Sequence, residues 1–551
     1  MSFKRITAFL ILGSVFCCFI FFVVAPKRPL NNPDGFDYLQ MALNLAHERN
    51  FLSTQIFLHH AYWFSRHGID LHNVSTVPML YRFPLPVIIE ALFMRIGFSP
   101  YVGAQLYSTL GYIFAGLILF WIVLRFSDSG WVSSALVSAF FLSGSTIEYA
   151  IGGLTEPLAT FFFLLLLIVL VSPSPLFVRT MFGALLCGLA FLNRSPSIFI
   201  MLPLLFIGII ISKKNRKLQF KHTGFICFSS LVVFALIIAP WLYRNYALTG
   251  NWFFNFTNAM NLLNGLNKSS SYANFYSLST FDFINSNFPY IIQKIVSNMI
   301  SGFINLRTLL GINKLFLLPF LLGLALIIYG RSTLLPDCNV SWLRRVVILW
   351  CSACFFNLAG QSLAWGQVDR FYAPLWPMVL VLAFTGNYFL LKNISGLSHY
   401  VRANMNKNII KFLAGIMTGI FYLVLNPPIL HPVESFLFSR PRETIQAVRE
   451  SKAILCSAKR NGAIISDVSD VLSVELHGCN LLMCRYEFDT SLLESSSSLQ
   501  EWDKFVDVEA IFISRQGWEH MSQEDKKILR EKKPIYPRII NFADGSRLYL
   551  K

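Results

Sequence analysis

Asp34 and Asp37 follow the first long apolar run of the chain, and Tyr38, Ala42 and Ala46 continue behind them at helical spacing. A carboxylate within reach of a hydroxyl can accept its proton, so either acid could act as a general base. The structural alternative is that Asp34 caps a helix and Asp37 lies in its first turn, where the helix dipole favours negative charge. Both interpretations predict a short helix that lies along the membrane surface.

Arg82 precedes Pro84 in the same predicted loop as the two acids. Its guanidinium offers a planar pair of N–H donors that suits an anionic group such as a lipid phosphate. The alternative is an arginine beside the membrane that extends its charged end to the interface. The residue type and its position leave both roles open.

Three further charged positions lie next to apolar runs. Glu156 opens one run, and Arg194 lies in a short turn between two others. Each could face a polar cavity, or could complement a helix dipole, Glu156 at a helix start and Arg194 at a helix end. Arg370 follows Asp369, and these two could form a local pair that contributes little if it is exposed.

Arg244 and Asn245 end another apolar run, and the segment 249–267 behind them is rich in amide and aromatic side chains. Amides can donate to and accept from sugar hydroxyls, and an aromatic ring can cover the apolar face of a sugar. An ordinary surface loop has a similar composition. The segment is therefore compatible with sugar binding without requiring it.

The composition indicates what kind of protein holds these residues. The chain has 551 residues, of which 55% are hydrophobic and 14% charged, whereas about 25% are charged in a typical soluble domain. The net charge is +17, but many of the basic residues lie in short loops between apolar runs, which indicates membrane topology. No repeat of basic and aromatic residues suggests binding of single-stranded nucleic acid. The sequence therefore predicts a polytopic α-helical membrane protein.

The apolar runs predict about eleven transmembrane helices with a cytoplasmic N-terminus. In this orientation the basic loops lie on the cytoplasmic side, as the positive-inside rule requires. The outer face then receives the loops 26–100 and 244–307 and the polar tail, so the candidate residues gather on that face around a predicted polar cavity. The segment 84–96 is too short to span and is predicted to be re-entrant or interfacial. The predicted spans are 6–25, 101–124, 131–148, 154–172, 178–193, 196–212, 222–243, 308–330, 343–361, 371–391 and 409–426.

The tail, residues 430–551, differs in kind from the transmembrane domain of residues 1–429. Its alternation of helical and strand patterns predicts a small α/β domain on the outer face, and about 120 residues are enough for a core of its own. The predicted elements are a helix at 443–456, a strand at 462–466, a helix at 468–476, a strand at 481–486, a strand at 510–514, a helix at 523–531 and a hairpin that turns at 544–545.

The ten cysteines divide between the two parts of the chain. Those in the apolar runs are predicted to pack as small hydrophobes, and the Cys351/Cys354 pair lies inside a span without companion metal ligands. Cys479 and Cys484 lie in the tail and could form a disulfide if the tail is in an oxidising compartment.

Taken together, several stretches resemble the GT-C class of integral-membrane glycosyltransferases, which use polyprenyl-phosphate sugars. The resemblance is to the branch that contains the protein O-mannosyltransferases, the aminoarabinose transferases of lipid A and the related lipopolysaccharide sugar transferases. It covers residues 30–380 in the right order. The stretches are Asp34 to Ala46, Arg82 to Pro84, Leu154 to Pro157, Pro240 to Asn245 and Arg370 to Pro374.

In that family the first outer loop carries the catalytic acid, often as Asp-Glu with a Tyr four residues after the Asp. Asp34 and Tyr38 keep this spacing, so the resemblance implies that Asp34 is the catalytic acid. Gly35 stands where the family has Glu, and Asp37 is the candidate to replace that second acid.

The resemblance implies an inverting transfer in which Asp34 takes the proton of an acceptor hydroxyl. Arg82 stands where the family has a basic residue that engages the donor phosphate, and it would stabilise the departing phosphate together with Arg244 or Arg370. Glu156 stands where the family often has an acid. The isolated acids make no evident metal site, and no cofactor is expected. Further substrate contacts are expected from Arg194, Asn245 and Tyr372.

The expected partners are a polyprenyl-phosphate sugar and a glycolipid, glycan or protein acceptor. The expected location is the plasma membrane, as a bacterial inner-membrane protein whose site and tail lie on the periplasmic side. Two alternatives are a flippase or transporter of lipid-linked sugars and a non-catalytic partner in envelope polysaccharide assembly. A transporter would have polar groups deep within its spans, whereas here they lie at outer helix ends, which favours a transferase. The sequence does not indicate the sugar or the acceptor.

Overall fold

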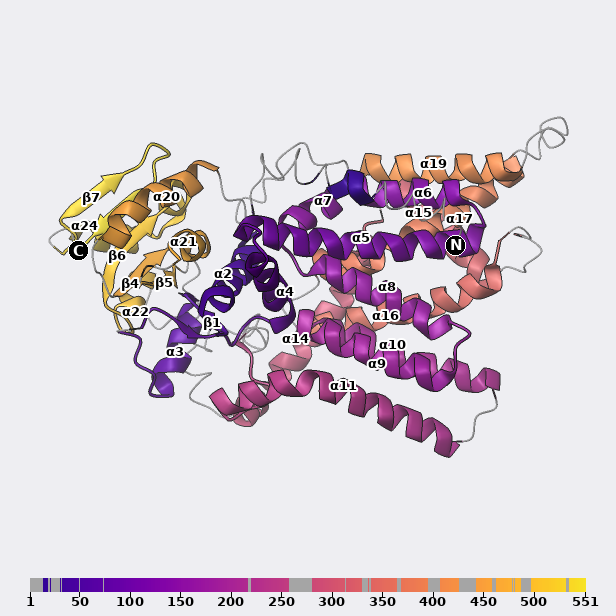
Figure 1. The fold of residues 1–551 in the computed structure, drawn as a ribbon, viewed down its shortest axis with the longest axis horizontal. Coiled ribbons are helices and arrows are strands. Elements are labelled where there is room, and N and C mark those ends of the chain that lie inside the picture. Colours follow the sequence, from indigo (N-terminus) through magenta and orange to yellow (C-terminus); the bar gives the residue numbers. More distant parts are fainter. Residues whose placement is uncertain are drawn as a thin grey trace.

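A computed structural model gives the arrangement of the chain as a helical bundle joined to a sheet-containing domain (Figure 1). Helix α2 (Pro33–Glu48) and helix α4 (Pro84–Arg95) lie between these two parts. The structure describes residues 13–17, 20, 30, 32–48, 50–72, 74–216, 220–256, 280–312, 314–329, 335, 338–363, 368–394, 407–425, 442–457, 462–477, 479, 481–486, 497–531 and 535–551.

The bundle consists of long helices that run side by side (Figure 1). Within the described residues, five helices are long and apolar enough to cross a membrane, and two more form a bent pair at an angle of 58°. Four shorter apolar helices accompany them. The bundle helices are α5 (Pro100–Ser127), the bent pair α6 (Gly130–Leu142) and α7 (Gly144–Ile151), α8 (Glu156–Val171), α9 (Leu176–Asn193), α10 (Ser197–Arg216), α11 (Phe220–Thr249), α14 (Thr280–Leu309), α15 (Lys314–Tyr329), α16 (Val340–Ser362), α17 (Trp376–Ile394) and α19 (Lys407–Leu425).

These helices confirm the prediction of a polytopic helical membrane protein. Each predicted span from 101–124 onward coincides with one of the bundle helices, although the predicted 131–148 span is broken at Ser143 between α6 and α7. The predicted span 6–25 falls largely outside the described residues, so the count of eleven stays a prediction. The predicted interfacial segment is helix α4, which starts with Pro84 at its first turn. The predicted outer loop 244–307 contains most of α14.

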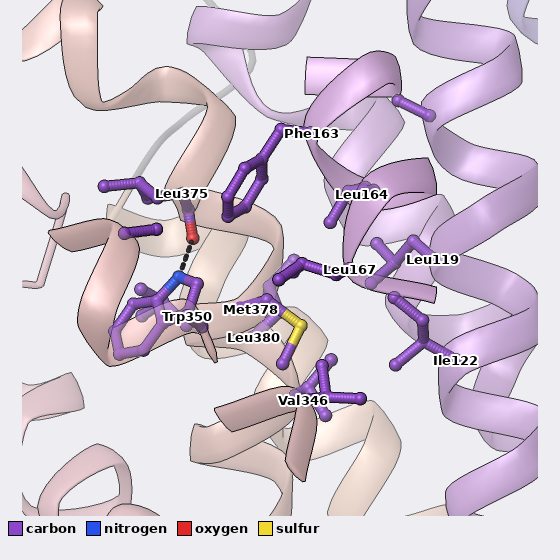
Figure 2. Packing of buried hydrophobic residues seen from close by; sticks show 14 of the residues in the cluster. Leu119, Ile122, Phe163, Leu164, Leu167, Val346, Trp350, Leu375, Met378 and Leu380 are labelled. Carbon is purple, nitrogen blue, oxygen red and sulfur yellow. Dashed lines mark hydrogen bonds between the residues drawn. The ribbon is translucent and has the colours of Figure 1, made fainter. Parts of the chain in front are cut away.

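The interior of the bundle is tightly packed and apolar. Leu167, Met378 and Trp350 meet between α8, α17 and α16, and the Trp350 indole donates to the Leu375 carbonyl at 3.0 Å (Figure 2). Lipid tails are as apolar as these side chains, so close contact between helices has to provide the stability. Gly323 on α15 illustrates this closeness, because a Cβ atom there would lie 1.8 Å from the Leu382 carbonyl oxygen of α17.

The C-terminal domain is built on a six-stranded sheet with the strand order β2-β5-β4-β6-β8-β7. Strands β4 (Gly462–Ser466), β5 (Leu481–Arg485) and β6 (Val508–Ile513) are parallel, and β7 (Arg538–Asn541) and β8 (Arg547–Leu550) form the predicted hairpin. Helices α20 (Arg442–Ser457), α21 (Ser469–Glu475) and α24 (Gln523–Glu531) confirm the predicted helices, and the short helices α22 (Ser498–Trp502) and α23 (Arg515–His520) were not predicted.

Strand β2 (Gln55–Ile56) was not predicted, and it connects the two parts of the chain. It belongs to the first outer loop, yet it pairs in parallel with β5 at the edge of the C-terminal sheet. The same loop pairs its short strands β1 (Leu52–Ser53) and β3 (Val77–Pro78), and carries helix α3 (Leu58–Arg66). The C-terminal domain is therefore attached to the first outer loop by backbone hydrogen bonds.

Helix α2 is buried on two opposite sides. Phe36, Leu39 and Leu43 share a core with buried residues of the C-terminal domain. Tyr38 and Met41 share a second core with the outer loop and with the other face of the same sheet. Because apolar contacts surround α2, the polar side chains of this helix are held in fixed positions between the bundle and the C-terminal domain.

The disulfide in the tail joins a different pair of cysteines from the pair considered in the sequence. Cys479 bonds to Cys456, with a Cα–Cα distance of 5.4 Å, whereas Cys484 is a free, buried thiol on β5. Cys456 lies in the last turn of α20, and the packing of this helix against α21 brings it next to Cys479. The pairing of Cys479 with Cys484 is therefore wrong.

Candidate active site

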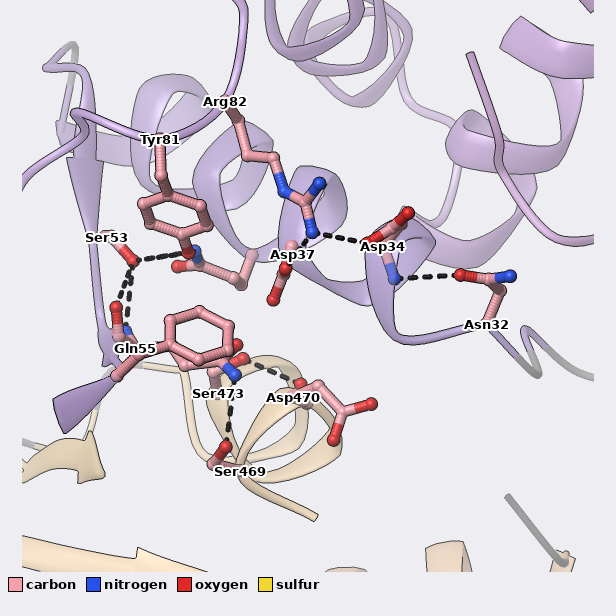
Figure 3. A network of polar contacts seen from close by, with 12 residues as sticks. Asn32, Asp34, Asp37, Ser53, Gln55, Tyr81, Arg82, Ser469, Asp470 and Ser473 are labelled. Carbon is pink, nitrogen blue, oxygen red and sulfur yellow. Dashed lines mark hydrogen bonds and ion pairs between the residues drawn. The ribbon is translucent and has the colours of Figure 1, made fainter. Parts of the chain in front are cut away.

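The start of α2 sets the direction of both acids. The Asn32 side-chain oxygen accepts the backbone N–H of Asp34 at 2.9 Å, and the Asn32 carbonyl accepts the N–H of Gly35 at 3.1 Å. Asn32 thus takes the capping role, and the interpretation of Asp34 as the helix cap is wrong. Asp34 and Asp37 lie one turn apart on the same side of the helix, and both carboxylates contact Arg82 (Figure 3).

Six predicted residues form one continuous series of ion pairs. Arg82 contacts Asp34 and Asp37 through Nη2, and Arg370 Nη1 lies 2.7 Å from the second oxygen of Asp34. Arg370 also reaches Glu156, with a distance of 3.8 Å from Nε to Oε1. The series is, in order, Asp37, Arg82, Asp34, Arg370, Glu156 and Arg194, and it ends in a Glu156–Arg194 pair of 2.9 Å.

Several elements bring these charges together at one end of the bundle. Glu156 is the first residue of α8, and Arg194 follows the last residue of α9. Arg370 lies in the 3-10 helix η2 (Asp369–Leu375), which leads into α17, and Arg82 stands just before Phe83, the N-cap residue of α4. The antiparallel run of the helices puts the start of α8 and the end of α9 on the same side, as the predicted topology required.

The middle of the series is more exposed than its two ends. The side chains of Asp37 and Glu156 are only 1% and 2% exposed, whereas those of Asp34 and Arg370 are 23% and 32% exposed. A reacting group has to touch its substrate. Asp34 and Arg370 are therefore the members best placed to meet a substrate, and Asp37 and Glu156 support them from inside.

The pKa values of the two aspartates are shifted in opposite directions. Burial would raise the pKa of Asp34, but the charges of Arg82 and Arg370 outweigh that effect and lower the pKa below its ordinary value. Among the described residues Asp37 forms an ion pair with Arg82 alone, and burial raises its pKa from 3.8 to about 6. With all groups ionised, three acids balance three arginines, so the cluster is neutral.

Gly35 explains why this chain lacks an acid directly after Asp34. A Cβ atom at Gly35 would lie 2.0 Å from the carbonyl oxygen of Gly152, in the turn before α8. Helix α2 thus approaches the bundle backbone too closely for any side chain at this position. Asp37, one turn later, stays the candidate for the second acid, and its side chain contacts Arg82 instead of the Gly152 backbone.

The other predicted substrate residues lie outside this series. Arg244 donates to the carbonyl oxygens of Met79 and Phe51 at 2.8 and 3.0 Å, and so fastens the outer loop to the end of α11. Asn245 donates to the Phe254 carbonyl at 3.2 Å. Tyr372 is fully buried in the bundle core. The structure thus gives Arg244 and Asn245 local bonding partners, and their proposed substrate contacts stay predictions.

A buried polar network beside the acids was missed in the sequence. Gln40 donates to Ser53 at 2.9 Å and accepts from the backbone of Thr54, and the Tyr81 hydroxyl joins Ser53 at 3.2 Å. Gln55 continues the network to Ser469 of the C-terminal domain at 3.0 Å (Figure 3). The spacing of Asp37, Gln40 and Asn44 could have revealed it, because these residues form one polar stripe at helical period.

No protein-family model matches the sequence, and no curated protein matches it. Several solved structures, however, match the fold of this chain. ArnT from Cupriavidus metallidurans, bound to undecaprenyl phosphate, aligns over 100% of this chain and 98% of its own, with a TM-score of 0.53 and 9% identity. The archaeal oligosaccharyltransferase AglB from Archaeoglobus fulgidus, in complex with an inhibitory peptide and a dolichol-phosphate, aligns over 93% of this chain and 69% of its own, with a TM-score of 0.53 and 12% identity.

The apo form of the Archaeoglobus fulgidus oligosaccharyltransferase gives a TM-score of 0.54 at 10% identity, over 93% of this chain and 70% of its own. At such low identities the likeness establishes the fold alone. It confirms the fold that the motifs predicted, including a bundle of many helices followed by a sheet-containing C-terminal region. This chain is therefore a multi-pass membrane protein with the GT-C fold.

Proposed function

We propose that this chain is a glycosyltransferase that moves a sugar from a polyprenyl-phosphate donor to an acceptor hydroxyl, with inversion at the anomeric carbon. The observation that carries the proposal is the convergence of Arg82 and Arg370 on the partly exposed Asp34. Two arginines and one carboxylate at an accessible helix end are the groups that such a transfer needs. The lipid phosphates bound to ArnT and AglB support the choice of donor.

The donor phosphate would take the place that Asp34 now holds on Arg370. A guanidinium binds a phosphate and a carboxylate with the same planar pair of N–H groups. Arg370 is the most exposed arginine of the series, at 32%, so it is the first that an incoming phosphate meets. The Glu156–Arg194 pair beneath it would keep its guanidinium oriented during the exchange.

Release from Arg370 would then prepare Asp34 for catalysis. Its pKa is lowered by the two arginines, and a carboxylate with a low pKa is a weak base. Once the phosphate neutralises those charges, the pKa of Asp34 rises and its free oxygen can accept the proton of the acceptor hydroxyl. The acceptor oxygen forms its bond to the anomeric carbon as the bond to the phosphate oxygen breaks, and Arg82 and Arg370 stabilise the departing phosphate.

The proposed location is the outer face of a plasma membrane, in a bacterium the periplasmic side of the inner membrane. The Cys456–Cys479 disulfide supports this side for the C-terminal domain, because disulfides persist in oxidising compartments. The proposed acceptors are envelope glycolipids, glycans or proteins, and the proposed sugar is a hexose or a pentose. No cofactor or metal enters the proposed mechanism.

The test uses the purified full chain in lipid vesicles with a radiolabelled polyprenyl-phosphate sugar and an extract of envelope acceptors. Transfer predicts that the label leaves the lipid and appears in a new product, and that Asp34→Asn slows this step about 10²–10⁴-fold, the usual contribution of a general base. Exposed Asp70 in the same loop offers the matched control, Asp70→Asn, with an unchanged rate. Label that crosses the bilayer still attached to its lipid would show a transporter instead.

A further inference from the structure

The C-terminal domain places one of its own side chains at the candidate active site. Strand β2 of the outer loop pairs in parallel with β5, with Gln55 opposite Met483 and Ile56 opposite Cys484. The next residues in this register are Phe57 and Arg485, where both strands end. The carboxyl ends of parallel strands form the edge at which open α/β sheets bind ligands.

Arg485 lies at this edge, and no acid of the described residues forms an ion pair with it, although the charge of Asp37 acts on it from a distance. Its guanidinium stacks over the Phe57 ring at 5.2 Å from the ring centre, and its side chain is half-buried. Within the described part of the chain, the guanidinium forms no ion pair and no hydrogen bond. Partial burial of an unpaired charge is unfavourable unless a ligand supplies the opposite charge. The ring beneath it keeps the guanidinium plane in place.

The charge of Arg485 acts on one of the acids of α2. Burial raises the pKa of Asp37 to about 6, and Arg485 is one of the two arginines whose charge opposes that rise. Gln55 lies in β2 beside β5 and bonds to Ser469. Figure 3 shows Asp37 and Gln55 between Arg82, on the bundle side, and the helix that carries Ser469 and Asp470, on the side of the C-terminal domain.

Two polar atoms in this region also lack partners. Asp37 Oδ1 and Gln55 Oε1 are buried and accept no hydrogen bond within the described residues. The region between α2, β2 and β5 therefore combines a half-buried cation with two buried acceptor atoms that the described residues leave unused.

Arg485 is not part of the charge balance proposed for the donor site. The six-residue series is neutral, and the donor phosphate is matched by the arginines that Asp34 releases. Arg485 is an additional positive charge that this exchange does not use. We propose that Arg485 binds an anionic group of the acceptor, a phosphate or a carboxylate, and so orients the acceptor hydroxyl toward Asp34. This inference rests on the proposed glycosyl transfer.

The experiment compares two reactions of the same donor in the full chain. One is transfer to the envelope acceptor extract, and the other is hydrolysis of the donor by water, which needs no acceptor. Arg485→Gln is expected to lower transfer about tenfold to a hundredfold, the effect of one charge-assisted hydrogen bond. Hydrolysis and the affinity for undecaprenyl phosphate are expected to stay within about twofold, and Arg485→Lys is expected to restore part of the transfer.

Arg538 provides the matched control. It is an exposed arginine on β7, at the opposite edge of the same sheet from β2. Arg538→Gln is expected to leave transfer and hydrolysis unchanged. Equal losses of transfer and hydrolysis in Arg485→Gln, weaker binding of undecaprenyl phosphate, or no change in transfer would each overturn the inference. Wild-type protein that cleaves no donor would instead refute the proposed function, and this inference with it.

The chemical nature of the anion is tested on the acceptor. Treatment of the extract with a phosphatase should lower wild-type transfer to the Arg485→Gln rate if the group is a phosphate. Amidation of carboxyl groups with a carbodiimide should do so if it is a carboxylate. An extract that keeps full wild-type transfer after both treatments would show that the acceptor needs no anion, and would exclude this role for Arg485.

Discussion

Arg370 Nη1 lies 2.7 Å from Asp34 Oδ2, so the residue proposed as the base is held by an arginine that is far from it in the sequence. This contact joins the first turn of α2 to the 3-10 helix before α17. It occupies the guanidinium that a donor phosphate would use. The ion pairs therefore balance the charges of the site, and an anionic substrate has to replace some of them.

Competition between Asp34 and the donor predicts an unusual variant. Asp34→Asn should slow transfer about 10²–10⁴-fold yet bind undecaprenyl phosphate more tightly, by about tenfold, because a neutral amide competes weakly for Arg82 and Arg370. Equilibrium binding to the purified chain in vesicles measures this. Weaker binding by Asp34→Asn, with Asp70→Asn unchanged, would show that Asp34 organises the arginines rather than competing with the phosphate.

Asp37 predicts how donor binding depends on pH. Its raised pKa, about 6, means that it loses its negative charge as the pH falls through 6. Because that charge lies beside Arg82, anion affinity should increase below pH 6, by about fivefold or more, the usual coupling between two neighbouring binding events. The methyl ester of undecaprenyl phosphate is the probe, since the charge of a phosphodiester is constant over this range. Asp37→Asn should bind with no step near pH 6, and a step that persists would assign the titration to another group.

The close approach of Gly35 to the bundle backbone predicts that no larger residue fits at this position. Gly35→Ala should lower the stability of the folded chain by about 1–3 kcal/mol, the usual penalty of overpacking, because its Cβ would overlap the Gly152 carbonyl. The apparent melting temperature of the purified protein measures the change. Gly130→Ala is the control, since a Cβ there meets nothing within 4 Å. A Gly35→Ala protein as stable as Gly130→Ala would contradict the close approach of α2.

The Glu156–Arg194 pair predicts non-additive effects. Glu156 and Arg194 are 2% and 9% exposed, so Glu156→Gln leaves a buried arginine short of its partner and should cost about 3–5 kcal/mol. The double variant with Arg194→Met should lose less than the sum of the two single variants. Thermal unfolding of the four proteins completes the cycle. Additive losses would mean that the two side chains do not interact.

The disulfide predicts a specific thiol pattern. Denatured, unreduced protein should carry alkylation on Cys484 but not on Cys456 or Cys479, as read by mass spectrometry of peptides. The bond closes a separation of 23 residues, so Cys456→Ser should destabilise the C-terminal domain by about 3 kcal/mol. Cys484→Ser is the control, because it should remove the alkylated thiol from the tail and leave the disulfide intact. Alkylation of Cys456 in the oxidised protein would contradict this pairing.

Much of the architecture follows from local patterns in the sequence. Apolar runs of spanning length become the bundle helices from α5 onward, and the alternating tail becomes helices and strands close to their predicted bounds, as in β4 and α24. Burial of an apolar face depends on the residues of that segment alone, which is why periodicity reveals it. The topology also placed Glu156 and Arg194 on one face, because the outer ends of antiparallel helices share it, and the structure shows that the two form an ion pair.

The sequence by itself therefore determined the class of fold and most of the charged residues of the site. Only the tertiary structure decided how they pair, with Arg370 on Asp34 and Arg244 instead on backbone carbonyls. It also decided that β2 joins the distant C-terminal sheet and that Cys479 bonds to Cys456. These relationships join segments far apart in the chain, and their distances depend on how whole elements pack, which no local pattern records.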